Sequence, residues 1–352
     1  MNHRFHCIVR GTILLLSIIF LCPCLSACHR KEKAVDGKPK ISVAYVQAQR
    51  AGVPDPNLFT HFIYSFAVFN DDNDGVVVEY PEKLKAMSGL KEENRNVKII
   101  LGVGGLKREG FSEMAGDKTK RKRFVENCAR IIKEYNLDGI DLDWEFPTTE
   151  KGGHTATPDD DVNYGLVVKE LRKKLGKNKW ISFYSNNTAN WIDFDRMLPY
   201  VDYVNVSGYN LDMPKPDKPL LHQSRLYKSK RWGKWCVEES IKAHVKKGVP
   251  VEKILLGIPF YARGKKPFPD YLEGKNYSRY DGYAQLEWDD EAKVPFLTDE
   301  EGNMILGFDN EQSIQAKCDF IKEYGLAGAF VWSYNADYED FRLSKALKIG
   351  LR

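Results

Sequence analysis

Cysteine is scarce in most of this sequence. Of its seven cysteines, four lie within the first 28 residues, which leaves Cys128, Cys236 and Cys318. These three are far apart and odd in number, so they predict neither a disulfide framework nor a zinc site. Cys128 and Cys318 fall on the apolar faces of expected helices, where a buried free thiol is the usual outcome. We expect no metal and no cofactor.

An excess of charge of either sign is also missing. Lysine and arginine total 53, aspartate and glutamate total 49, and the net charge is +4. Nucleic-acid binding usually needs a concentrated basic face, and no G-x-G-x-x-G or P-loop motif follows the first expected strand to hold a nucleotide. The composition therefore suits an uncharged ligand such as a sugar, without a nucleic-acid partner, and we expect a monomer.

A long apolar run occurs near the start of the chain, where residues 11–21 follow the basic residues Arg4 and Arg10. The run is too short for a comfortable membrane span and is typical of a secretory signal peptide. It leads to the tetrad LSAC, which ends at Cys28 and resembles a bacterial lipobox. We therefore expect residues 1–27 to be removed and Cys28 to be lipidated. The alternative is an ordinary signal peptide with a chance cysteine.

Residues 28–40 are charged and lack apolar periodicity, which indicates a flexible tether. Acyl chains on Cys28 would anchor the protein firmly, since each buried methylene contributes about 0.8 kcal/mol. His29 follows the cysteine instead of aspartate, so nothing signals retention in the inner membrane. The expected location is the bacterial cell envelope, lipid-anchored, at the periplasmic or surface face of the outer membrane.

Eight short runs rich in β-branched and aromatic residues recur through the rest of the chain. They are 41–46, 61–69, 97–103, 138–146, 180–185, 202–209, 254–260 and 327–333. Between them, residues 118–135, 161–175 and 311–324 carry apolar residues at helical spacing. Strands that alternate with helices in this way predict an α/β fold, a (β/α)8 TIM barrel over residues 41–352. A doubly wound open sheet is the alternative.

Two segments are longer than normal connections, residues 210–236 and residues 262–308. The second is expected to form a small insertion between the seventh and eighth strands. Long loops at the carboxyl end of a barrel usually build the functional site, so both are candidates to border it.

The most informative segment is LDGIDLDWEFP, residues 137–147. In it, Asp141, Asp143 and Glu145 alternate with large apolar residues. Because strand side chains point alternately to two faces, the three acids share one face. The apolar face must pack against helices, so the acids are expected to line the barrel interior, with Glu145 nearest the carboxyl end. A solvated acidic edge strand is the alternative, which the continuous apolar face disfavours.

Three carboxyl groups placed so closely cannot all ionise in a low-dielectric interior. They should titrate together and keep one carboxyl protonated near neutral pH. A general acid needs that protonation state, so the segment predicts acid/base catalysis.

The octapeptide DGIDLDWE resembles the D-x-x-D-x-D-x-E signature of glycoside hydrolase family 18, the chitinase family. Other stretches resemble further strands of that family: 60–67, 98–105, 202–210, 256–263 and 328–333. The resemblance implies retaining hydrolysis in which the substrate's own 2-acetamido carbonyl attacks the sugar and forms an oxazolinium intermediate. Glu145 would protonate the leaving oxygen and later activate water.

The resemblance also implies roles for the neighbouring groups. Asp143 would hold the acetamide N–H, Asp141 would share a proton with Asp143, and Tyr209 would hydrogen-bond the acetamide oxygen. Trp332 would form the apolar floor beneath the reacting sugar. Further substrate contacts are expected at Tyr45, Phe66, Gly105, Asn210, Tyr261 and Arg263.

The chain departs from the family pattern at three positions. Gly102 stands where serine is common, Ser207 replaces methionine, and Asn210 replaces aspartate. Gly102 lacks a hydroxyl that would support Asp141, although Tyr45 can still do so. The 262–308 insertion is shorter than the insertion domain of processive chitinases, which implies a shallower cleft.

Three functions are compatible with these features. The first is hydrolysis of β-1,4-linked N-acetylglucosamine in chitin or chito-oligosaccharides. The second is an endo-β-N-acetylglucosaminidase that acts on N-glycans with the same catalytic strand. The third is a sugar-binding lipoprotein that has lost catalysis, although family members of that kind commonly lack the final acid, here Glu145. Trp232 and Trp235 would either extend a sugar platform or pack within their loop.

Overall fold

The computed structural model describes residues 39–274, 276 and 285–352, which lie in one compact unit. The expected signal peptide 1–27, the expected lipidation site Cys28 and most of the expected tether lie outside the described residues. Among the described residues, no helix is long and apolar enough to cross a lipid bilayer.

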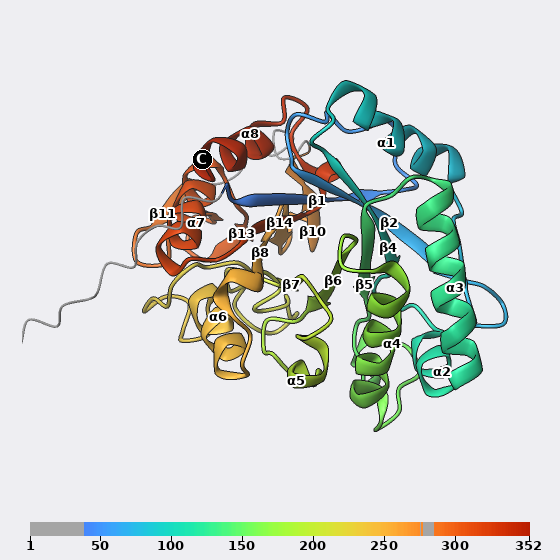
Figure 1. The fold of residues 1–352 in the computed structure, drawn as a ribbon. Coiled ribbons are helices and arrows are strands. Elements are labelled where there is room, and N and C mark those ends of the chain that lie inside the picture. Colours follow the sequence, from blue (N-terminus) through green and yellow to red (C-terminus); the bar gives the residue numbers. More distant parts are fainter. Residues whose placement is uncertain (1–38, 275, 277–284) are drawn as a thin grey trace, which may run out of the picture. The chain divides into compact units, whose positions relative to one another are not determined.

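Eight parallel strands of the described chain close into a barrel, with β1 paired to both β2 and β14 (Figure 1). In barrel order they are β1 Ile41–Gln47, β2 His61–Phe69, β4 Lys98–Gly104, β5 Gly139–Asp143, β6 Trp180–Ser185, β7 Tyr203–Val206, β8 Ile254–Pro259 and β14 Gly328–Trp332. A short strand, β3 Val76–Val77, pairs antiparallel with the last residues of β2. The predicted TIM barrel is confirmed.

Helices surround the barrel on its outer side (Figure 1). They are α1 Pro81–Glu93, α2 Phe111–Gly116, α3 Lys118–Glu134, α4 Asp160–Leu175, α5 Phe194–Met197, α6 Val237–Lys246, α7 Glu311–Tyr324 and α8 Arg342–Gly350, with the 3-10 turns η1 Glu150–Gly152, η2 Val251–Lys253 and η4 Tyr334–Ala336. The three helices expected from spacing are α3, α4 and α7. Asn310 caps α7, and Gly325 ends it in the left-handed conformation that glycine favours.

Apolar side chains fill two layers. The outer layer lies between strands and helices, and in it Trp144 stacks on Phe111 at 5.0 Å between ring centroids. Cys128 and Cys318 are buried there as free thiols, as their helical positions predicted. The inner layer fills the barrel, and its amino-terminal end is closed by Trp180, whose ring stacks on Tyr203 at 4.3 Å.

The insertion between β8 and β14 is an antiparallel sheet in the order β10-β9-β13-β12-β11. Its strands are β9 Tyr261–Gly264, β10 Tyr271–Glu273, β11 Gln285–Asp289, β12 Val294–Thr298 and β13 Met304–Gly307. The sheet has small apolar cores of its own. It begins directly after β8, so β9 lies beside the carboxyl end of the barrel.

The acidic strand is shorter than the sequence predicted. The expected strand 138–146 ends at Asp143, and Glu145 lies two residues beyond it. The Gly105 amide donates to the Asp143 carbonyl at 2.9 Å, past the last paired residue of β4. Trp144 is fully buried in the outer layer, so the alternation of apolar and acidic side chains continues although the strand has ended.

Candidate active site

Asp141 is the innermost of the three acids and is fully buried. Its Oδ2 accepts from the Tyr45 hydroxyl at 2.7 Å. Its Oδ1 accepts from Ser182 Oγ at 2.5 Å and from Asn205 Nδ2 at 2.9 Å. Burial raises the pKa of Asp141 from 3.8 to about 6, while these three donors oppose the rise. The donors therefore stabilise the ionised form of a carboxyl group that water does not reach.

The contact between Tyr45 and Asp141 was anticipated from the sequence, whereas Ser182 and Asn205 were not. Each occupies an inward position of its strand, on β6 and β7, and this alternation is the one signal that could have found them. A serine at Gly102 would not fit, because a Cβ there would lie 2.5 Å from the Tyr64 carbonyl oxygen. Ser182 thus supplies a hydroxyl that Gly102 cannot.

Asp143 and Glu145 lie nearer the carboxyl end of the barrel. Burial raises the pKa of Asp143 well above its usual range, and the Glu145 and Asp141 carboxylates raise it further. Asp143 Oδ1 is buried without a hydrogen-bond partner among the described residues. Burial also raises the pKa of Glu145 from 4.5 to about 7. Near neutral pH, this pair holds at least one proton beside the ionised Asp141.

Tyr209 and Asn210 form the turn that follows β7. Tyr209 is buried and meets Tyr261 edge-on at 6.0 Å. Burial raises the pKa of Tyr209 well above its usual range, so its hydroxyl keeps the proton that it can donate. Asn210 has a φ of 52°, a left-handed conformation in which asparagine is among the least strained residues. The Asn187 amide holds the carbonyls of both residues, at 3.2 and 3.3 Å.

Asn210 is the meeting point of two side chains from β9. Its Oδ1 accepts from the Tyr261 hydroxyl at 2.9 Å and from Arg263 Nε and Nη2 at 3.2 and 3.0 Å. An amide oxygen suits these donors without placing another carboxylate near Glu145. The departure from aspartate at this position is therefore accommodated by its neighbours.

Trp332 ends β14 and is partly exposed at the carboxyl end of the barrel. Its ring stacks on Phe66 at 5.9 Å with planes 13° apart, and Tyr45 lies 5.7 Å away. Gly105, with a φ of 98°, leaves room for Phe66, since a Cβ there would lie 3.0 Å from the ring. These contacts fix a flat apolar surface next to the acids.

The sequence left open whether Trp232 and Trp235 extend a sugar platform or pack within their loop. In the structure, both indoles are used in contacts within the protein. Trp232 is buried against the insertion sheet, edge-on to Phe296 of β12 at 5.0 Å. Trp235 Nε1 donates to Asn187 Oδ1 at 3.2 Å. Because Asn187 in turn holds the carbonyls of Tyr209 and Asn210, Trp235 supports that turn. Like Ser182 and Asn205, Tyr184 was missed: it is buried in the barrel interior, 6.2 Å from the Phe146 ring, and burial and the nearby Glu145 carboxylate raise its pKa well above its usual range.

A comparison with models of protein families identifies the family to which this set of acids, tyrosines and tryptophan belongs. The model described as "Glycosyl hydrolases family 18" matches residues 39–337. The chain belongs to glycoside hydrolase family 18. It is a glycoside hydrolase of the chitinase type, and the resemblance seen in the acidic segment is confirmed at the level of the family.

Several known proteins resemble the chain at modest identity. Chitinase A1 of Niallia circulans is 27% identical over 298 residues, which are 72% of this chain and 42% of that protein. Chitotriosidase-1 of Mus musculus is 27% identical over 82% of this chain and 68% of its own length. The solved family 18 N-acetylglucosaminidase of Paenibacillus barengoltzii has a TM-score of 0.79 and 28% identity, and the match covers 88% of this chain and 99% of that one. The chain thus spans less than half of Chitinase A1.

Proposed function

We propose that this protein cleaves β-1,4-linked N-acetylglucosamine in chitin or chito-oligosaccharides, with retention and through an oxazolinium intermediate. One observation carries the proposal. Asp141, Asp143 and Glu145 approach the site from one strand and its extension, whereas the turn after β7 carries Tyr209 and Asn210. A carboxylate nucleophile would have to face Glu145 across the scissile bond, about 5–5.5 Å away. The 2-acetamido group of the substrate fills that role instead.

The first half of the reaction needs a proton at Glu145. With a pKa near 7, Glu145 is protonated in a large fraction of molecules at neutral pH and can protonate the leaving oxygen. As the acetamido carbonyl attacks the anomeric carbon, positive charge develops on the acetamide. Asp143, whose Oδ1 has no hydrogen-bond partner among the residues that the structure describes, accepts the acetamide N–H, and the Tyr209 hydroxyl donates to the acetamide oxygen.

Asp141 makes the change of charge at Asp143 possible. Its three donors stabilise its ionised form, and the proton on the high-pKa Asp143 can pass to it when the developing cation favours an ionised Asp143. Ionised Glu145 then takes a proton from water, which attacks the oxazolinium and restores the sugar with its original anomeric configuration.

The partners that suit the site are uncharged N-acetylglucosamine glycans. Trp332, stacked on Phe66, offers the ring face on which the apolar side of a sugar packs. Arg263 and Tyr261 surround Asn210 at the adjacent edge and present hydrogen-bonding groups to sugar hydroxyls.

We also propose that the protein is a lipoprotein of the bacterial cell envelope, anchored through Cys28. The support is the LSAC tetrad after a short apolar run. His29 stands where aspartate would signal retention in the inner membrane, so we favour an outer-membrane position, which membrane fractionation tests.

Product analysis tests the enzymatic proposal. Purified protein is incubated in parallel with chitohexaose, cellohexaose and a high-mannose glycoprotein, and the anomer first formed is identified by NMR. We expect cleavage of chitohexaose with retention and no cleavage of cellohexaose, which lacks the acetamido nucleophile. A thiazoline analogue of the oxazolinium should inhibit competitively, and Tyr209→Phe should weaken both turnover and that inhibition.

Three outcomes would contradict the proposal. Release of glycans from the glycoprotein without cleavage of chitohexaose would identify an endo-β-N-acetylglucosaminidase. Binding of chitohexaose without any product would identify a sugar-binding protein. A covalent sugar trapped on an aspartate or glutamate by a 2-fluoro glycoside would exclude substrate assistance.

A further inference from the structure

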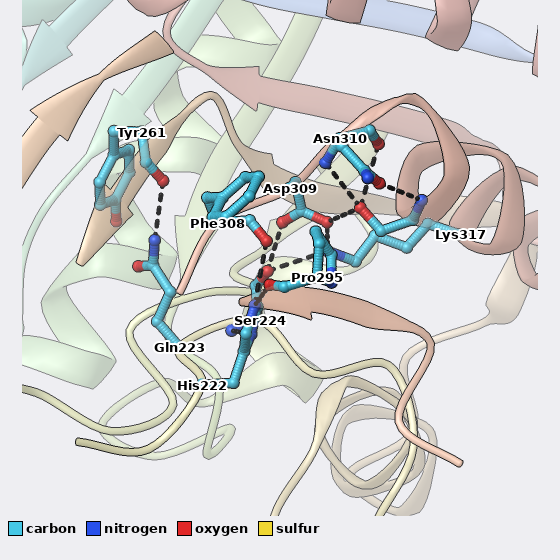
Figure 2. Close-up of polar contacts among 10 residues, drawn as sticks. His222, Gln223, Ser224, Tyr261, Pro295, Phe308, Asp309, Asn310 and Lys317 are labelled. Atoms are coloured by element: carbon cyan, nitrogen blue, oxygen red, sulfur yellow. Dashed lines mark hydrogen bonds and ion pairs between the residues drawn. The ribbon is translucent and has the colours of Figure 1, made fainter. Parts of the chain in front are cut away.

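A second set of polar side chains is buried beside the insertion sheet, away from the three acids. We call it the buried polar cluster: His222, Ser224, Asp309, Ser313 and Lys317, each at most 1% exposed. The first two lie in the long loop between β7 and α6, Asp309 precedes α7, and the last two lie on α7 (Figure 2).

Asp309 is the centre of the cluster. It forms an ion pair with Lys317 and accepts hydrogen bonds from the Ser224 hydroxyl and, at 2.6 Å, from the Ser313 hydroxyl. Lys317 also donates to Ser224 Oγ at 2.9 Å. Figure 2 shows these contacts converging between the loop and the start of α7. The long loop is therefore tied to α7 by a charged group and not by apolar packing alone.

His222 extends the cluster to the insertion sheet. Its Nε2 lies 3.0 Å from the carbonyl oxygens of Pro295 and Phe308, so this nitrogen carries the proton. Its Nδ1 accepts from the Ser224 amide at 3.2 Å, which requires that nitrogen to be unprotonated. The ring is thus neutral, and burial lowers its pKa to about 4. The loop, the sheet and α7 are joined at one point.

A buried ion pair is a costly way to join three segments. Removing both charges from water is costly, and a well-packed apolar pair is often at least as stable. Its contacts are directional, however, and fix the backbone at residues 222–224 more closely than apolar packing would. Such a cluster is explained by a role in which the exact position of residues 222–224 matters more than the stability of the fold.

Gln223 connects the cluster to the active site. It lies between two cluster residues and is fully buried. Its side-chain Nε2 donates to the Tyr261 carbonyl at 2.8 Å, and its own carbonyl accepts from the Leu211 amide at 3.0 Å. Leu211 directly follows Asn210. Gln223 thus contacts both segments that border the acetamide side of the site, as Figure 2 shows for Tyr261.

We propose that the buried polar cluster, acting through Gln223, positions Tyr209, Asn210 and Tyr261 for the acetamido group of the substrate. The inference rests on the proposed function of Tyr209. Gln223 is a positioning residue, since it acts on the reacting groups through the backbone of their segments. Misplacement of a reacting group by about 1 Å can cost a hundredfold in rate, so the loss of this support should be measurable.

The test is Gln223→Met, which keeps the side-chain length and removes both polar atoms, while the cluster itself stays intact. We expect kcat/KM on chitohexaose to fall about ten- to a hundredfold and the inhibition constant of the thiazoline analogue to rise by a similar factor. The inhibition constant distinguishes a misplaced site from a loss of folded protein, because it does not depend on how much of the protein is folded. Met87→Ala, in the buried face of α1, is the control: it should lower Tm and leave the inhibition constant unchanged.

A second variant tests the cluster. Asp309→Asn combined with Lys317→Met removes the ion pair without leaving an unpaired buried charge, and it should raise the inhibition constant in the same way. If Gln223→Met does not fold, Gln223→Asn, too short to reach the Tyr261 carbonyl, takes its place with the same expected result.

The outcomes are distinguishable. Gln223 variants that bind the thiazoline analogue as tightly as wild type would overturn the positioning role and leave the proposed function intact. If the double variant has the wild-type inhibition constant while Gln223→Met has a raised one, the role proposed for the buried polar cluster is wrong and only that of Gln223 stands. Wild-type protein that does not bind the analogue at all would overturn the proposed function, and this inference with it.

Discussion

Glu145 must hold a proton when the substrate arrives and lack one when water attacks. A glutamate in water, with a pKa of 4.5, is almost fully ionised at neutral pH and would be a poor acid. Partial burial at the end of the acidic segment raises the pKa of Glu145 to about 7, where both forms are accessible. Activity on chitohexaose should therefore fall as the pH rises through about 7, because the acid form is lost.

Glu145→Gln isolates this proton transfer. The variant keeps the shape of the side chain but cannot exchange a proton, so turnover should fall by at least 10²–10⁴-fold, roughly the contribution of general acid/base catalysis. Binding of chito-oligosaccharides, measured by calorimetry, should persist because Trp332 and Asn210 are untouched. Retention of more than about a tenth of wild-type turnover would show that another residue is the acid.

At the scale of the element, β5 carries two buried carboxyl groups through the barrel interior. The strand tolerates an ionised Asp141 because β1, β6 and β7 contribute one donor each to it, and it tolerates Asp143 because the raised pKa of that group favours its neutral form. Burial still makes the ionised form costlier in the folded protein than in the unfolded chain, and this is why the pKa of Asp141 is about 6. The strand therefore links stability to pH.

The sign of this linkage can be measured with Asp141→Asn. Below about pH 4, Asp141 is protonated in both states and its full stabilising contribution is present. As the pH rises toward 6, the unfolded chain releases the proton while the folded protein retains it, so stability is lost. At about 1.4 kcal/mol per pKa unit, wild type should lose about 3 kcal/mol relative to the variant.

Urea unfolding of both proteins from pH 4 to 7.5 provides the comparison. The half-buried His61 and the buried His222 and His244 have lowered pKa values, which act in the opposite sense. They are present in both proteins, so they cancel in the difference. Stability curves that run parallel across this range would show that Asp141 has the same pKa in the folded and unfolded states.

At the scale of the whole molecule, the first described residues and the three acids lie at opposite ends of the barrel. Pro39 and Lys40 precede β1 and so lie at the amino-terminal end of the barrel, where Lys40 donates to the Leu326 carbonyl at 2.8 Å. Glu145 and Trp332 lie at the opposite, carboxyl-terminal end. A chain anchored ahead of Pro39 would present its site away from the anchor.

Cys28→Ala tests this arrangement. We expect the wild-type protein to partition into detergent with membranes, and the variant to lose the lipid-dependent processing at residue 28. On soluble chitohexaose the two should have equal kcat/KM, because the proposed anchor precedes Pro39, which lies at the end of the barrel opposite the acids. Wild-type protein that is free in solution, with a mature N-terminus other than Cys28, would refute the lipid anchor.

Much of this could be predicted from local sequence, because the responsible patterns are themselves local. Strand alternation and helical spacing are set by residues within a few positions, so the barrel strands and α3, α4 and α7 were found within a few residues. The acidic segment needs eight consecutive residues to show its period, and this was sufficient to predict the family. The end of β5 at Asp143 was missed, because the alternation of side chains continues through Trp144 and Glu145 after strand pairing stops.

The amino-acid sequence by itself thus determined which side chains are acidic, which face they share and the barrel that holds them. Only the tertiary structure decided that Ser182 and Asn205 would satisfy Asp141, and that Lys317 would meet Asp309 and Ser224 beneath the insertion sheet. Ser224 and Lys317 are 93 positions apart in the chain. Contacts over such separations depend on how the closed barrel aligns its strands and loops in space, and no short-range pattern in the chain encodes that alignment.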